Sequence, residues 1–216
     1  MSVTDKLACS LGRKDELPNI ELAELLCENN DIAGIKEIVD GLKGKNKTVA
    51  NDCIKVLYEV GERNPRLIEN YAVDFISLVC SKNNRLAWGS MMALSKIAEY
   101  VPETVYGRLP VIINAYKEGS VITVDNSISV FAGLCKAKTD YSKEVLPVII
   151  GHLEKCRPKD VPQHAERASV CFDRVNAKDF IAVLEKRRTS LMSSQQTRIN
   201  KLIKKLNCLA VAQDNE

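Results

Sequence analysis

Four side chains with metal-binding chemistry lie close together in the sequence: His152, Cys156, His164 and Cys171. His152 and Cys156 are spaced i, i+4, so on a helix they share one face. Four nitrogen and sulfur ligands are enough for a zinc site. The spacing, however, matches no zinc-finger pattern. Positions in register with Cys156 carry Gly119 and Lys82, which are not ligands. The pattern therefore favours a buried or solvated pair, and we expect neither a metal ion nor another cofactor.

Residues 157–167 form the most unusual polar segment of the chain. Two prolines flank an expected helix start, and an amide, an imidazole, a carboxylate and a guanidinium follow. One interpretation is a turn between helices, with Asp160 as the N-cap. The other is a stiff polar surface that contacts a partner through Lys159, Gln163, His164, Glu166 and Arg167. His164 has the chemistry of a general acid or base, but no nucleophile stands out beside it, so we expect no catalytic residue.

The elements that would position these residues follow from a repeat of 37 residues. Residues 109–113 read Leu-Pro-Val-Ile-Ile, and residues 146–150 read the same. Three sets of apolar residues share this offset: Leu57, Leu94 and Phe131; Val60, Ile97 and Leu134; Ile54, Met91 and Ile128. A period of this length predicts helical units that stack on their neighbours.

The fold class is therefore expected to be all-α, an α-α superhelix of about five helical hairpins with a C-terminal capping helix. Breaks at Asn64-Pro65 and Val101-Pro102 separate the helices within a unit. Pro110 and Pro147 are expected in the first turn of second helices, where a missing N–H is harmless. We predict one domain over residues 1–216, with repeats at 20–46, 47–83, 84–120, 121–157 and 158–191 and the capping helix at 194–208.

Composition agrees with a folded helical protein. Of the 216 residues, 45% are hydrophobic and 5% aromatic, and glycine and proline are few. The eight cysteines form no C-x-x-C pair. Most occupy positions where a repeat needs a small apolar residue, as Cys53 does, which is typical of free thiols in a reducing compartment. No signal segment and no membrane-length apolar run is present, so we expect a cytoplasmic protein without a membrane partner.

The net charge of +3 conceals a basic C-terminal segment. Residues 186–205 carry seven basic residues and no acid, and the rest of the chain carries −4. The segment is interpreted either as a solvated helical face or as a patch for nucleic acid or another polyanion. Its basic residues are Lys186, Arg187, Arg188, Arg198, Lys201, Lys204 and Lys205.

Paired helices of this length, with a proline at the internal break and Leu-Pro opening the second helix, resemble HEAT and armadillo repeats. Residues 84–98 are particularly similar to the first helix of a HEAT repeat, and the resemblance covers residues 20–190. It points to a HEAT/armadillo-like repeat protein of the small prokaryotic type, with the choice between the two repeats left open. It implies a right-handed superhelix with second helices on the concave side. Such proteins mostly bind proteins, sometimes bind nucleic acids, and seldom catalyse.

Residues one repeat apart should become neighbours in space, which places Trp88 beside Asp125 and Asn126. These residues either fill space and cap helices or form a recognition groove with an aromatic anchor. The most favoured function is a non-enzymatic binding module for a protein or peptide, as a monomer or a weak homodimer. The alternative is a nucleic-acid-binding protein similar to HEAT-like DNA alkylation-repair glycosylases, in which Asp125 would be the catalytic acid.

Overall fold

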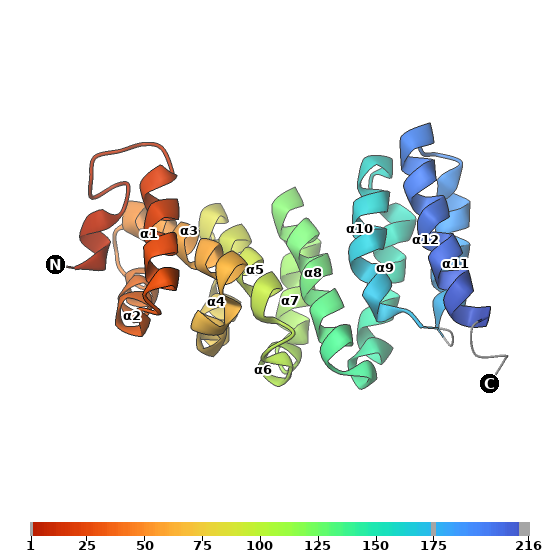
Figure 1. The fold of residues 1–216 in the computed structure, drawn as a ribbon, viewed down its shortest axis with the longest axis horizontal. Helices are drawn as coiled ribbons and strands as arrows, with labels where there is room; N and C mark the ends of the chain where they lie inside the picture. Colours follow the sequence, from red (N-terminus) through yellow and green to blue (C-terminus); the bar gives the residue numbers. More distant parts are fainter. Residues whose placement is uncertain (1, 174–175, 212–216) are drawn as a thin grey trace. The chain divides into compact units, whose positions relative to one another are not determined.

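The computed structural model describes residues 2–173 and 176–211, and within this part the chain forms helices and no β-strand (Figure 1). The predicted all-α class is therefore confirmed. None of the helices described is long and apolar enough to cross a membrane. Contacts within the chain group the residues into two compact units, Met1–Val130 and Phe131–Glu216, which we call the N-terminal and C-terminal units.

The N-terminal unit is built from two rows of helices. The first row consists of α1, α3 and α5, with α3 packed between the other two (Figure 1). The second row contains α2, which packs on α3, and α4, which packs on α5. The helices of this unit are α1 (Leu17–Glu28), α2 (Ile32–Gly41), α3 (Lys47–Arg63), α4 (Ala72–Leu78), α5 (Asn84–Ile97), α6 (Pro102–Tyr106) and α7 (Leu109–Glu118), and α8 (Val121–Ala137) begins here and continues past Val130.

Helix starts in this unit follow the 37-residue period, because the capping residues follow it. Asn46 accepts a hydrogen bond from the Thr48 N–H at 3.0 Å, and Asn83 accepts one from the Arg85 N–H at 3.2 Å. One period later Ser120 accepts one from the Thr123 N–H at 3.3 Å. Such N-caps satisfy amide groups that the first turn leaves without partners. Asp31 caps α2 in the same way, accepting from the Gly34 N–H at 2.8 Å.

The apolar residues of the repeat form the core between α3 and α5. Ile54, Leu57 and Val60 of α3 are 0% exposed, and so are their counterparts Met91, Leu94 and Ile97 of α5. The three corresponding residues of α8 are also buried. Cysteines follow the prediction in part: Cys53, Cys135 and Cys171 are buried, whereas Cys80 and Cys208 are exposed.

The segment before α1 is attached to the helices rather than loose. Leu7 and Ala8 are buried. The Cys9 N–H donates to the Asp52 carboxylate of α3 at 2.8 Å, and the Ala8 N–H donates to the Asn19 side chain at 2.9 Å. This packing covers the outer end of the first helical pair and brings Glu16, the residue before α1, close to α3 and α5.

The C-terminal unit has a similar double row. It contains α9 (Ser142–Lys155), α10 (Val161–Ala168), α11 (Ala177–Arg188) and α12 (Ser193–Val211). α9 packs on α10 and α11, and α12 packs on α10 and α11 (Figure 1). The last helix is longer than the predicted capping helix at 194–208. Its apolar side carries Ile199, Leu202, Ile203 and Leu206, all buried.

Only one of the two predicted helix-opening prolines opens a helix. Pro110 lies in the first turn of α7, as expected, but Pro147 lies inside α9. Gly107 and Glu144 occupy the same position in consecutive repeats. Gly107 ends α6, whereas Glu144 lies in the first turn of α9. Glutamate has a higher helix propensity than glycine, so the second helix extends upstream of Pro147 instead of being interrupted.

Candidate functional site

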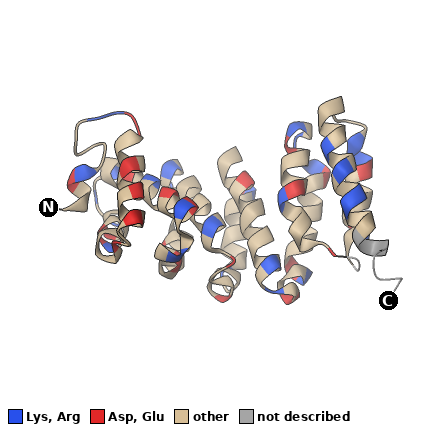
Figure 2. Ribbon diagram, in the orientation of Figure 1, with Lys and Arg blue, Asp and Glu red and all other residues tan. Residues whose placement is uncertain are grey.

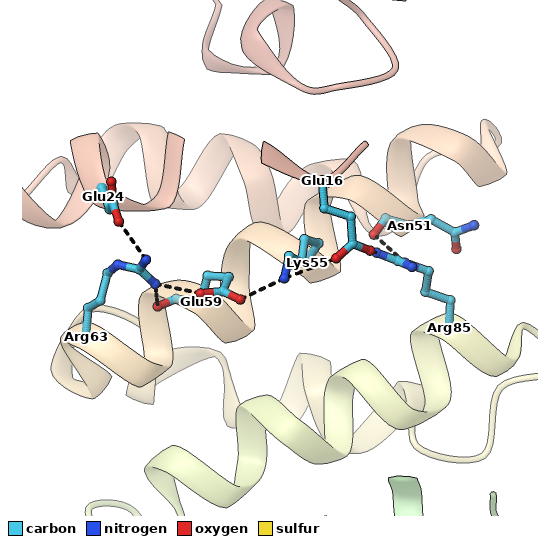
Figure 3. A network of polar contacts seen from close by, with 7 residues as sticks. All are labelled: Glu16, Glu24, Asn51, Lys55, Glu59, Arg63 and Arg85. Carbon is cyan, nitrogen blue, oxygen red and sulfur yellow. Dashed lines mark hydrogen bonds and ion pairs between the residues drawn. The ribbon is translucent and has the colours of Figure 1, made fainter. Parts of the chain in front are cut away.

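A network of polar contacts runs across α1, α3 and α5 of the N-terminal unit (Figure 3). We call the side of the unit that carries it the three-helix face, formed by Glu16, α1, α3 and α5. Its charged residues alternate in sign and pair across the helices, as Figure 3 shows for Glu24 of α1, Lys55, Glu59 and Arg63 of α3 and Arg85 of α5.

Lys55 is the centre of this network. Its Nζ lies 2.7 Å from Glu59 Oε1 and 3.2 Å from Glu16 Oε2, and its side chain is 8% exposed. Arg63 lies 2.6 Å from Glu59 and 2.8 Å from Glu24, and Arg85 pairs with the other oxygen of Glu16. Lysine is rarely buried unless paired. Two carboxylates provide that pairing here, and they tie α3 to the neighbouring chain segments.

The charges of the network shift the pKa values of Glu16, Lys55 and Glu59. Burial raises the pKa of the Glu16 and Glu59 carboxyl groups, but hydrogen bonds and charges from the paired Lys55, Arg63 and Arg85 outweigh it, so both pKa values lie below the ordinary value. For Lys55, burial lowers the pKa, but the hydrogen bond to Glu59 and the interactions with Tyr58 and Glu16 together outweigh it, so the pKa of Lys55 is raised. All three groups are therefore charged at neutral pH.

Replacing Lys55 with methionine tests the network. The apolar stem remains, but Glu16 and Glu59 lose a shared cation and keep only Arg85 and Arg63, so we expect a loss of about 1.5 kcal/mol in the free energy of unfolding. Carboxyl groups with lowered pKa values stabilise the fold above their unfolded pKa, and this contribution disappears as the pH falls through the folded pKa. Removing Lys55 raises the folded-state pKa values of Glu16 and Glu59, so the midpoint of acid unfolding should move to higher pH.

The matched control for this variant is Lys36→Met. Lys36 also forms an i, i+4 pair, with Asp40 at 2.8 Å, but both side chains are exposed. Exposed ion pairs contribute little to the free energy of unfolding, so Lys36→Met should unfold at the same denaturant concentration and the same acidic pH as the wild-type protein. Equal behaviour of the two variants in circular dichroism melts would show that burial of Lys55 has no energetic consequence.

Trp88, the only tryptophan, is held on the three-helix face by aromatic and cationic neighbours. Its ring lies 5.8 Å from that of Tyr58 on α3, tilted by 46°. The Arg85 guanidinium lies 5.3 Å from the Trp88 ring centroid, and Lys55 Nζ lies 4.9 Å from that of Tyr58. Both distances suit cation–π attraction. Trp88 remains half-buried, so part of a fixed ring faces outward.

Asp125 and Asn126 are half-buried on α8. Asn126 donates from Nδ2 to the Ile122 carbonyl at 2.8 Å and lies 3.4 Å from the Ser95 hydroxyl of α5. Asn126 therefore contacts α5 at Ser95, about two helical turns beyond Trp88. The groove predicted from Trp88, Asp125 and Asn126 stays a prediction, and the closest described aromatic partner of Trp88 is Tyr58.

The 157–167 segment separates into exposed and buried residues. Lys159, Gln163 and Glu166 are exposed and Arg167 is half-buried, which is compatible with a contact surface. His164 is 2% exposed, so it does not belong to the exposed part of this surface, and its role in partner binding stays a prediction. Asp160 precedes α10 but makes no capping bond, because its carboxylate accepts from Arg157 Nε at 2.6 Å. Asp160 therefore occupies the N-cap position of α10, but its side chain does not cap the helix.

Side-chain contacts divide the basic C-terminal segment into engaged and exposed residues. Arg187 donates to the carbonyls of Leu153, Glu154 and Cys156 at 2.6–2.9 Å, and Arg198 forms a bidentate pair with Glu166 at 2.6 and 2.8 Å. Basic residues recur along α12 (Figure 2). In the described part of the chain, Lys186, Lys201, Lys204 and Lys205 are exposed and no acid pairs with them.

Sequence reasoning did not identify Lys55 and Tyr58 as site residues. Lys55, Glu59 and Arg63 follow one another at i, i+4 spacing, which is a recognisable pattern of intrahelical pairs. Nothing in the sequence, however, indicates that Glu16 reaches Arg85 from 69 residues away.

Comparison with known proteins gives matches in structure alone. No family model and no curated protein matches the sequence. An engineered protein is similar with a TM-score of 0.66 and 16% identity, covering 96% of this chain and 98% of that one. A designed armadillo repeat protein in complex with the peptide (KR)4 has a TM-score of 0.66 and 12% identity, covering 87% and 86%.

A natural protein is also similar in fold. The karyopherin Kap121p bound to the SUMO protease Ulp1p has a TM-score of 0.67 and 11% identity, covering 96% of this chain and 23% of the karyopherin. The helical pairs, their 37-residue period and these similarities agree. The chain therefore has the α-helical repeat fold of armadillo- and HEAT-like proteins.

Proposed function

We propose that this chain is a non-enzymatic binding module that holds a peptide segment of a protein partner against the three-helix face. The observation that carries the proposal is the state of Trp88, which is partly exposed and yet held by Tyr58 and Arg85. A preorganised aromatic ring loses little conformational entropy on binding, and tryptophan is the residue most enriched among interface hot spots.

Charge supports a basic or mixed-charge peptide. The N-terminal unit carries 15 Lys and Arg residues against 18 Asp and Glu residues, a net charge of −3. Glu24 of the network is exposed on α1, and so are Glu21 and Glu28 of the same helix. The fold neighbours support binding rather than catalysis, since the designed armadillo protein is described with a basic peptide and the karyopherin with a protein partner.

The test uses the purified chain and a displayed library of random peptides. Selected peptides are synthesised, and their affinities are measured through the fluorescence of Trp88, which as the only tryptophan reports on this face. Trp88→Ala, measured by calorimetry, should lose at least about 2 kcal/mol of binding, or roughly 30-fold in affinity.

Tyr100→Ala provides the control for this substitution. Tyr100 is also a partly exposed aromatic residue beneath a guanidinium, with Arg66 4.3 Å from its ring centroid, but it lies beyond the end of α5. This variant should bind the selected peptides as the wild type does. Selected peptides that bind Trp88→Ala with unchanged affinity would place the binding site elsewhere and contradict the proposal.

The alternative function, nucleic-acid binding, rests on the exposed Lys186, Lys201, Lys204 and Lys205 of the C-terminal unit. Phosphate binding releases counterions, so retention on DNA would fall steeply as salt rises. Retention at low salt that disappears when the three lysines of α12 become alanines would favour this function. No retention at low salt would eliminate it.

A further inference from the structure

Three of the four side chains with metal-binding chemistry meet at one end of the C-terminal unit, although their spacing in the sequence matches no zinc-finger pattern. His152 lies in the last turn of α9, Cys156 is the residue that ends this helix, and His164 lies in α10. Their ligand atoms all lie within 4.8 Å of one another. Cys171, the fourth residue considered from the sequence, lies outside this group and next to Cys135.

The two imidazoles face each other directly. His152 Nε2 lies 2.8 Å from His164 Nδ1, and the ring centroids are 4.8 Å apart. His164 is 2% exposed and His152 is 8% exposed. A contact this short between ring nitrogens requires one to donate a proton and the other to accept it. One lone pair and one N–H thus point into the same small space, and a cation in that space would take the place of the shared proton.

The backbone around the three side chains is held in place independently. Pro158 and Pro162 restrict the turn between α9 and α10, and Arg157 pairs with Asp160 across it at 2.6 Å. Arg187 of α11 donates to three carbonyls at the end of α9, and one of them, the Leu153 carbonyl, also lies 3.9 Å from the Cys156 Sγ. The site is therefore supported by a second set of contacts, as preorganised metal sites are.

We propose that His152, Cys156 and His164 bind a divalent transition metal ion of the zinc class. Imidazole nitrogen and thiolate sulfur are both ligands that zinc accepts, and Cys156, which is half-exposed, leaves the fourth position accessible to water. Tetrahedral coordination requires the two nitrogens to be about 3.4 Å apart, so side-chain rotation must separate them by roughly half an ångström from the present contact. The bound ion joins α9 to α10.

Cobalt(II) is the probe for this site, since it occupies zinc sites and its absorption reports the ligands. The full chain is stripped with a chelator, kept reduced and titrated with CoCl2. One equivalent should produce the visible bands of tetrahedral cobalt together with a thiolate-to-cobalt charge-transfer band, and ZnCl2 should displace it. Zinc should also raise the thermal unfolding temperature, because an ion that binds only the folded state stabilises it.

Variants assign the ligands. Cys156→Ser should abolish the charge-transfer band, and His164→Gln should weaken cobalt binding by roughly 100-fold or more. Cys80→Ser, which alters an exposed cysteine of the N-terminal unit, should leave the spectrum unchanged. A wild-type chain without the charge-transfer band at stoichiometric cobalt, or a band that persists in Cys156→Ser, would overturn the proposal. Neither result depends on the folding of His164→Gln, and neither affects the proposed peptide binding at Trp88.

Discussion

Replacing Phe180 with alanine is expected to lower the free energy of unfolding by about 4 kcal/mol. Phe180 of α11 is 0% exposed, and its ring stacks on Phe172 with centroids 3.9 Å apart and an interplanar angle of 12°. The substitution removes buried apolar surface and the ring contact together, and the close-packed helices around it refill the cavity only in part. The loss should be the largest of any single substitution considered for this protein.

The measurement is urea unfolding combined with hydrogen exchange. Repeat proteins can unfold in parts, so exchange should rise in α11 and its neighbours α9 and α12 more than in α1 to α5. Val170→Ala is the control, since Val170 is 57% exposed and its truncation should change the unfolding free energy by less than about 0.5 kcal/mol. A Phe180→Ala variant within about 1 kcal/mol of the wild type would mean that this core rearranges freely.

Replacing Gly89 with leucine is expected to cost about 3 kcal/mol by separating α3 from α5. A Cβ atom at Gly89 would lie 2.7 Å from Cγ1 of Ile54 and 3.2 Å from its Cγ2. Ile54 is 0% exposed and cannot move aside without disturbing the core. Alanine at this position gains helix propensity of about 1 kcal/mol and loses a similar amount to the clash, whereas leucine adds three further carbons to the same gap.

Gly151 provides the matched control for this prediction. It also lies within a helix, α9, but apart from its chain neighbours and the backbone of its own helix nothing lies within 4 Å of a Cβ built there. Gly151→Ala should therefore stabilise the chain by about 0.8 kcal/mol, and Gly151→Leu should be close to neutral or stabilising. Thermal melts followed by circular dichroism measure both effects, and the fluorescence of Trp88, the neighbour of Gly89, reports the effect of Gly89→Leu on the N-terminal unit. Equal melting temperatures for Gly89→Leu and Gly151→Leu would contradict the close packing of α3 on α5.

The three-helix face depends on this close packing. Tyr58 and Trp88 meet because α3 and α5 approach closely at Gly89, and the same approach brings Arg85 of α5 near Glu16, which also contacts Lys55 of α3. A Gly89→Leu variant that remained folded should bind selected peptides more weakly than the wild type although no contact residue is altered. That result would link the packing of the repeats to the proposed function.

The sequence by itself determined the helical class, the period and most helix ends. These are local properties: helix N-caps such as Asn46 and Asn83 act on amides two or three residues away, and apolar residues at helical spacing share a face wherever the helix lies. The prediction that Pro147 opens a helix is wrong, because the start of α9 depends on the helix propensity of neighbouring residues as well as on the proline.

Only the tertiary structure decided which polar side chains meet. Glu16 joins Lys55 and Arg85 because the N-terminal segment packs against α3, and His164 turns inward to His152 because the turn held by Arg157 and Asp160 folds α10 back on α9. Such pairs depend on the angle between helices and on the path of the connecting turn. Both are set by many weak contacts distributed along the chain, so the identity and spacing of the paired residues carry no signal of them.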